Sequence, residues 1–292
     1  MTRLDQFESV FNAAAKTVYH HEPIAIQSIL VVTDLDAYQT DLFAKGIRGF
    51  LSVLEKNDGE CAWHKIDGEG WGDLESLLEL VEKHKPDLIC SYRNLRSDAK
   101  KWPYSLGAYM DVLTQVTDIP VLLFPNPESH DPDSKDDVTY PYTKTGVVMA
   151  ITDHLTGDAR LVDYSVAFTS DDGTLFLTHL EDRRAFNHYI DTISKIPAIH
   201  TDAARELILK QLLKEPKDYI LSCKQVLKEK GINIQLEKIV ELGDRLEDYK
   251  RLVDEHKVDL LVFNTKDDDQ LAMHGMAYPL AVELRELPLL ML

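Results

Sequence analysis

A short stretch of this chain occurs twice: residues 82–90 (EKHKPDLIC) recur as residues 254–262 (DEHKVDLLV). Each copy starts polar, contains a His-Lys pair, and passes through an aspartate into an apolar segment. A period of more than about 100 residues makes the repeat unit a domain and not a solenoid module. The sequence therefore predicts the same fold twice in one chain.

Matched segments also flank the two copies. An apolar segment ending in Thr-Asp lies upstream of each copy and closes at Asp34 and at Asp153. A proline followed by an apolar run lies downstream of each, at residues 120–124 and 288–292. Such short apolar runs alternate with amphipathic helical segments, which is typical of an α/β sheet with parallel strands and right-handed crossovers.

The region between the two halves marks a domain boundary. Residues 125–144 are rich in proline and aspartate and poor in apolar residues, which is typical of a linker. We expect a first domain over residues 1–130, a linker over 131–144 and a second domain over 145–292. The first domain lacks one helix–strand unit of the second. We expect an amphipathic helix at residues 4–18 to cover the sheet face left bare.

Composition restricts the function classes. The 292 residues carry a formal charge of −18, which argues against nucleic acid and against a polybasic membrane anchor. No apolar run reaches the roughly 20 residues that span a bilayer, so we expect no membrane insertion. The three cysteines form no CxxC pair, which favours a reduced, cytoplasmic compartment.

Taken in order, these segments resemble the universal stress protein family twice, and the whole chain resembles its tandem-domain type. The resemblance implies two doubly wound α/β domains of the HUP type, each with a five-stranded parallel sheet, the first one shortened. It also implies that the two last strands pair with each other inside the chain, as a pseudo-dimer with a pseudo-twofold axis. Further association into a homodimer stays open.

Nucleotide-binding members of that family carry G-x2-G-x9-G-[ST] after the fourth strand, where glycine backbones and a helix N-terminus cradle phosphates. In the first half, these glycine positions fall on Asn94, Ser97 and Gly107, and Ala108 follows in place of the hydroxyl residue. In the second half, the last position falls on Gly275, followed by methionine. Both copies of the motif are degenerate.

The two loops that contain these positions differ in charge. The first has four basic residues against one acidic residue, and two of the four, Arg93 and Arg96, come first. The second has three consecutive aspartates at 267–269 against one lysine. Two interpretations of the first loop stay open. Its basic side chains bind ATP or another anion in place of a backbone cradle, or they balance neighbouring acids on a solvated loop.

Asp34 and Asp153 are the remaining site candidates. The family resemblance implies that they face a base and ribose at the carboxyl edge of the sheet, and the alternative is an ordinary turn or helix-capping carboxylate. We find no metal-ligand spacing among the eleven histidines and no nucleophile or phosphate-loop motif. We therefore expect no catalytic residue and no metal site.

The function expected from these observations is a cytoplasmic stress-response or regulatory binding protein, not an enzyme. Its partners would be proteins that the sequence does not identify, and it would need no cofactor. Two alternatives are kept. The first is binding of ATP or another anionic nucleotide in the first domain alone, and the second is a weak hydrolase on the same scaffold.

Overall fold

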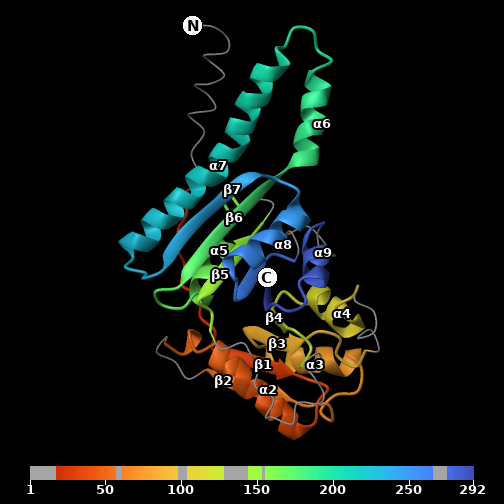
Figure 1. Cartoon of the computed structure of the whole chain (residues 1–292). Coiled ribbons are helices and arrows are strands. Elements are labelled where there is room, and N and C mark those ends of the chain that lie inside the picture. The colour runs from red at the N-terminus through yellow and green to blue at the C-terminus, as the bar shows by residue number, and fades with distance from the viewer. Residues whose placement is uncertain (1–17, 57–60, 98–103, 128–143, 153–154, 266–274) are drawn as a thin grey trace.

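The computed structural model describes residues 18–56, 61–97, 104–127, 144–152, 155–265 and 275–292. Within them the strands form one nine-stranded sheet in the order β2-β1-β3-β4-β9-β8-β5-β6-β7 (Figure 1). The strands are β1 (Ser28–Val32), β2 (Ala62–Ile66), β3 (Leu88–Tyr92), β4 (Val121–Phe124), β5 (Val147–Ile151), β6 (Thr174–Asp182), β7 (Gln235–Gly243), β8 (Leu260–Phe263) and β9 (Leu289–Met291).

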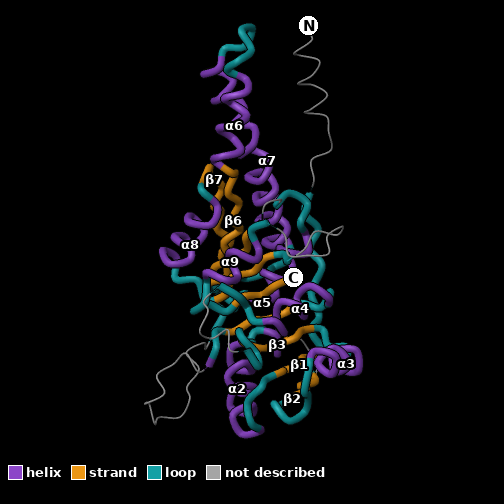
Figure 2. The backbone as a smooth tube through the Cα atoms, turned by 90° about the vertical axis from the view of Figure 1, so that its right-hand side faces the viewer, coloured by secondary structure: helices purple, strands orange, loops and turns teal. Residues whose placement is uncertain are grey.

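Helices lie on both sides of this sheet (Figure 2). They are α2 (Ala37–Phe50), α3 (Leu74–His84), α4 (Ala108–Val116), α5 (Ala159–Phe168), α6 (Arg183–Ile193), α7 (Thr201–Glu229), α8 (Arg245–His256) and α9 (Ala277–Glu283). Because the helices cover both faces, the central strands are buried on both sides, which explains their continuous apolar runs such as Leu260–Phe263.

The sheet joins two parallel halves through one antiparallel contact. In the first half β2, β1, β3 and β4 run parallel, and in the second β9, β8, β5, β6 and β7 run parallel. Between the halves, β4 and β9 run antiparallel, with Val121 opposite Met291 and Leu123 opposite Leu289. The carboxyl ends of the two sets of strands therefore point in opposite directions.

The predicted α/β fold is confirmed, including the shortened first half. The described part of the first half has four strands where the second has five. The extra strand of the second half is β7 at the sheet edge, which follows β6 through α6 and α7. The predicted linker at 131–144 and the predicted helix at 4–18 lie outside the described residues, apart from Lys144 and Val18.

Two helices of the second half differ from what local sequence rules predict. Those rules predict a helical region over 201–230 that breaks at Pro216, but α7 runs through this residue. A proline removes one helix hydrogen bond, and here Pro216 and the following Tyr219, Ile220 and Cys223 are all buried, so packing holds the helix together. α6 was not predicted. The spacing of apolar residues also predicts a helix over 271–286, of which residues 271–274 lie outside the described ones and α9 is the helical part.

A helical hairpin extends beyond the sheet (Figures 1 and 2). It consists of α6 and the part of α7 before Pro216. The buried residues of α7 begin at Pro216 and continue to Leu227, where the helix lies against β7 and β6. Before Pro216, α7 has no fully buried residue and packs against α6.

Candidate functional site

The duplicated stretch has the same structural role in both halves. It ends α3 in the first half and α8 in the second. Lys85 and Lys257 follow these helices with positive φ values of 42° and 52°, which is the left-handed conformation of a helix C-cap. The next aspartate then accepts hydrogen bonds from the start of the first strand. Asp87 accepts from the backbone N–H groups of Gln27 and Ser28 at 2.8 and 2.9 Å, and Asp259 from that of Val147 at 2.8 Å.

The repeated histidine completes this arrangement. The ring of His84 packs at a tilt against His64 of β2 with centroids 4.5 Å apart, and the ring of His256 packs at a tilt against Phe176 of β6 at 4.3 Å. Burial, and next the neighbouring His64, lower the pKa of His84. The duplicated stretch therefore ends a helix and connects two strands in each half.

The loop after β3 carries most of the predicted site residues, and Asp34 lies beside it. The Asp34 carboxylate accepts hydrogen bonds from the hydroxyl of Tyr92 and, at 2.7 Å, from the backbone N–H of Arg96. The hydroxyl of Tyr92 in turn accepts from the backbone N–H of Asp34 at 3.2 Å. This carboxylate therefore connects the segments that follow β1 and β3.

Arg96 binds the protein's own backbone. Its guanidinium donates to the carbonyl oxygens of Gly68 and Trp71 and lies 4.5 Å from the centroid of the Trp71 ring. The indole N–H of Trp71 donates to the carbonyl of Thr33 at 2.8 Å. Arg96 therefore closes the loop before α3 onto the ends of β1 and β3, and its planar side chain suits both the carbonyl contacts and the ring.

Arg93 points out of the loop and into the second half. It is 4% exposed, and its guanidinium donates to the carbonyl oxygens of Ala281 and Leu284 at the end of α9. A cation at a helix C-terminus is favoured by the helix dipole and satisfies carbonyls that have no partner inside the helix. The antiparallel contact between β4 and β9 makes this possible, because it brings the carboxyl edge of β3 to the end of α9.

The predicted phosphate cradle is filled by the loop itself. Gly107 has φ 92°, and a Cβ atom there would lie 2.8 Å from the Cα of Asn94. The backbone N–H groups of Gly107 and Asn94 donate to Ser105 Oγ and to the Leu106 carbonyl at 2.9 and 2.7 Å. The N–H of Ser97 donates to the Asn94 carbonyl at 3.2 Å. The glycine therefore permits a close backbone contact within the protein.

The remaining basic residues of this loop, and most of the acidic loop in the second half, lie outside the described residues. The same is true of Asp153. Gly275 is described and lies in an exposed turn, where an added Cβ would meet open space. α9 begins two residues later without a side-chain cap. The structure thus brings Asp34, Asn94, Arg96, Ser97 and Gly107 together, turns Arg93 away, and leaves Gly275 apart.

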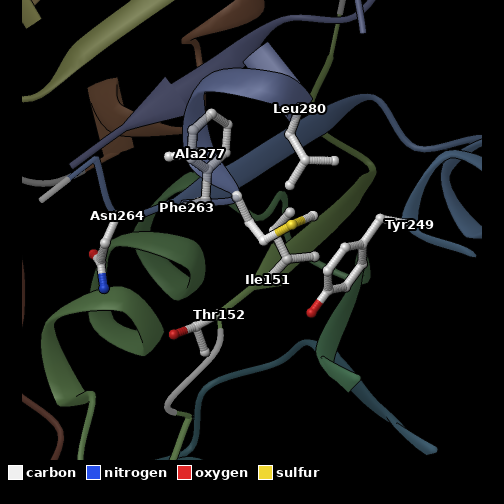
Figure 3. Close-up of a pocket in the computed structure, with 8 residues that line it drawn as sticks. Ile151, Thr152, Tyr249, Phe263, Asn264, Ala277 and Leu280 are labelled. Atoms are coloured by element: carbon white, nitrogen blue, oxygen red, sulfur yellow. The ribbon is translucent and has the colours of Figure 1, made fainter. Parts of the chain in front are cut away.

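A pocket lies at the carboxyl edge of the second half. It is lined by Ile151, Thr152, Tyr249, Phe263, Asn264, Met276, Ala277 and Leu280. In Figure 3, Thr152 and Asn264 lie on one side, and the ring of Tyr249 and the side chain of Leu280 on the other. The volume open to the centre of a water molecule is about 20 Å³, enough for ordered water and far too small for a nucleotide. The amide of Asn264 donates to Asp158 at 2.6 Å, and Asp158 caps α5.

Sequence analysis missed a buried polar cluster around Asp163 of α5. This carboxylate is 3% exposed and accepts hydrogen bonds from the Tyr19 hydroxyl at 2.5 Å, from His21 Nδ1 at 2.7 Å and from the backbone N–H of Glu22 at 3.2 Å. Burial, and next the hydrogen bond to Asp163, raise the pKa of Tyr19. The sequence offers one sign of this cluster: Asp163 is a charged residue among the apolar residues of a predicted helix.

The described residues contain no group of three or more metal-ligating side chains, and none of their helices is long and apolar enough to cross a membrane.

Comparison with known proteins adds structural neighbours only. No protein-family model and no curated protein matches the chain. Among solved structures, a functionally unknown protein of Pseudomonas aeruginosa PAO1, PA1789, is similar at 13% identity and TM-score 0.48, with 92% of each chain covered.

A universal stress protein of Archaeoglobus fulgidus is similar at 11% identity and TM-score 0.40, over 91% of this chain and 85% of that one. The hypothetical protein MJ0577 is similar at 15% identity and TM-score 0.38, over 51% of this chain and 96% of that one. Similarities this weak assign no function to this chain.

Proposed function

We propose that this chain is a regulatory binding protein of the universal stress protein type that works without a bound nucleotide. The observation that carries the proposal is the use of the loop after β3. Both described arginines of this loop donate to backbone carbonyls of the protein, Arg93 in the second half and Arg96 in the first. A phosphate would have to compete with these hydrogen bonds for the same donors.

The backbone supports the same proposal. Four N–H groups that would surround a phosphate, those of Asn94, Arg96, Ser97 and Gly107, donate to acceptors inside the protein. The Asp34 carboxylate accepts hydrogen bonds from Tyr92 at the end of β3 and from Arg96 in the loop that follows. Its negative charge opposes an incoming anion. In this proposal, the degenerate motif is part of the scaffold, and protein partners are bound elsewhere on the surface.

Thermal unfolding with added ATP tests the proposal. A ligand that binds only the folded state at 100 times its Kd stabilises that state by about 2.7 kcal/mol, which is a shift of several degrees in a chain of this size. We expect no shift in melting temperature with ATP and Mg²⁺. We also expect no adenine nucleotide in the mass spectrum of small molecules released from protein purified without added ligand.

Three outcomes would contradict the proposal. A stoichiometric adenine nucleotide, or a shift with ATP that Arg96→Gln abolishes and the exposed-residue control Arg48→Gln does not, would favour nucleotide binding in the first half. Steady release of phosphate from ATP above the blank would favour the hydrolase alternative.

A further inference from the structure

The α6–α7 hairpin carries exposed apolar side chains towards its outer end. Residues 183–215 extend beyond the sheet as two helices and the connection between them (Figures 1 and 2). Among the described residues, four of the nine exposed large apolar side chains lie on this hairpin. They are Tyr189, Ile196, Ile199 and Leu207, with exposed fractions of 57%, 45%, 41% and 65%. Apolar side chains that gather on a protruding surface mark a contact site, and we name these four residues the hairpin patch.

Tyr189 and Leu207 lie on the same side of the hairpin. The Arg205 guanidinium donates to Asn187 Oδ1 at 3.3 Å, so these two side chains meet on one side of the two helices. Two positions along an α-helix turn a side chain by about 200°. Tyr189 follows Asn187 by two positions. Leu207 follows Arg205 by two positions, so both apolar side chains point to the opposite side.

Other residues hold the hairpin together. Phe186 and Ile190 of α6 are each 1% exposed, and the Arg205 guanidinium lies 5.7 Å from the centroid of the Phe186 ring. In the connection, the backbone N–H of Ile196 donates to the Ile193 carbonyl at 2.9 Å, and that of Ile199 to the Ile196 carbonyl at 3.1 Å. The side chains of the hairpin patch are therefore free to serve an external contact.

The charge of the hairpin differs from that of the rest of the chain. Residues 183–215 contain six basic and four acidic side chains, a formal charge of +2, which leaves −20 for all other residues. Two copies that met through the rest of the chain would bring these negative charges together. α6 has 11 residues and is about 16 Å long, about twice the Debye length at physiological ionic strength. Contact at the outer end of the hairpin therefore lets two copies meet with little repulsion.

We propose that the hairpin patch is the interface of a homodimer in which two α6–α7 hairpins pack face to face about a twofold axis. In a twofold contact both copies use the same surface, so the apolar side of one hairpin meets the apolar side of the other. Two layers of two helices form a four-helix bundle, which buries the apolar side of each layer. This arrangement keeps the acidic remainder of each copy at opposite ends of the dimer.

The size of the hairpin limits the strength of this contact. The part of α7 before Pro216 has 15 residues, so one side of the two helices is about 22 Å long and about 20 Å wide. Two such sides together cover roughly 900 Å², which lies at the lower end of specific interfaces. We therefore expect monomers and dimers in equilibrium, with a dissociation constant of about 10–100 μM.

Analytical ultracentrifugation of the full-length chain tests the proposal. We expect the average mass to rise from that of one copy towards that of two copies between about 1 μM and 1 mM protein. A chain that stays monomeric over this range would overturn the proposal. A mass that continues to rise beyond the dimer would also overturn it, because a twofold contact is closed.

A matched pair of variants locates the interface. Tyr189→Glu with Leu207→Glu places like charges in the hairpin patch and should raise the dissociation constant at least about tenfold. The control is Tyr38→Glu with Leu221→Glu, which adds the same charges at side chains that are 68% and 54% exposed outside the hairpin. Thermal unfolding checks that both proteins are folded. Equal weakening in the two proteins, or an unchanged dimer in the hairpin variant, would overturn the proposed interface.

The salt dependence of the dimer gives an independent test. Salt screens the repulsion between the acidic remainders of the two copies, whereas the apolar contact itself does not depend on this screening. Raising NaCl from about 50 to 500 mM should therefore lower the dissociation constant by about threefold or more. A contact held by ion pairs would weaken instead, so a rise in the dissociation constant would overturn an apolar interface.

Discussion

The two halves of the molecule use equivalent residues, Arg93 after β3 and Thr265 after β8, in different ways. Arg93 follows β3 and Thr265 lies just after β8, and each donates its backbone N–H to the end of its own half's last strand, at 3.1 Å to Phe124 and at 2.9 Å to Leu292. The side chains then diverge. Arg93 crosses to the end of α9, whereas the Thr265 hydroxyl donates to the same Leu292 carbonyl at 2.8 Å. The backbone hydrogen bond is therefore the same in both halves. The side chain of Thr265 bonds within its own half, whereas the side chain of Arg93 joins the two halves.

The largest expected effect comes from removing the Arg93 side chain, which joins the two halves. Arg93→Met should lower the free energy of unfolding by about 2–4 kcal/mol, because it removes the donor from a buried carbonyl at Ala281 and from a partly buried one at Leu284. Thr265→Val removes one hydrogen bond and should cost about 1 kcal/mol. Urea denaturation measures both, and Arg48→Met, at an exposed ion pair, is the control with a cost below about 1 kcal/mol. Equal losses at 93 and 265 would show that Arg93 does not join the halves.

The equivalent aspartates of the duplicated stretch, Asp87 and Asp259, give a second comparison with smaller expected losses of stability. Asp87→Ala should destabilise the protein by about 2 kcal/mol and Asp259→Ala by about 1 kcal/mol, since Asp87 accepts two backbone hydrogen bonds and Asp259 one. The measurement is again urea denaturation with a check that the slope is unchanged. A larger loss at Asp259 would break the equivalence of the two stretches.

The Asp163 cluster joins the segment before β1 to the second half, and it predicts an effect of alkaline pH on stability. The folded state raises the pKa of Tyr19 above its ordinary value, so the folded state holds this proton more tightly. The resulting stability is complete below about pH 10 and is lost as the pH rises further. Tyr19→Phe should therefore reduce the loss of stability above pH 10, by up to about 1.4 kcal/mol per pH unit. Identical alkaline slopes for the two proteins would mean that this hydroxyl is not buried against Asp163.

The smallest effect concerns the contact between the rings of His64 and His84. His64→Phe makes the first half resemble the second, where Phe176 occupies the corresponding place. Burial lowers the pKa of His84 first and His64 second, so the substitution should raise the pKa of His84 part of the way towards its ordinary value. An NMR titration of the imidazole signals between pH 5 and 8 measures this shift. A further fall in the pKa of His84 would mean that the added burial by the phenylalanine ring outweighs the loss of the charge repulsion from His64.

The alternation of strands and helices along the chain and the duplicated stretch could be predicted because they depend on local patterns. Apolar runs identify buried strands, and the His-Lys-x-Asp sequence marks a helix end before a strand. The sequence alone also shows that Asn94 and Ser97 occupy positions where the expected phosphate motif has glycine.

The partners of Arg93 and Arg96 could not be predicted. A basic loop has the same composition whether its arginines bind an anion or backbone carbonyls, and the acceptors of Arg93 lie nearly 190 positions away at Ala281 and Leu284. The path of α7 through Pro216 was missed for a similar reason. Burial against the sheet outweighs the local helix-breaking tendency of proline, and burial is a property of the fold.

The single antiparallel contact between β4 and β9 also determines where the two halves present the ends of their strands. Since the strands of the two halves run in opposite directions within one sheet, the carboxyl ends of β3 and β8 lie on opposite borders of that sheet. Parallel sheets of this kind hold ligands at the carboxyl ends of their strands. A ligand held in this way by one half would therefore lie on the border of the sheet opposite to a ligand held in the same way by the other half.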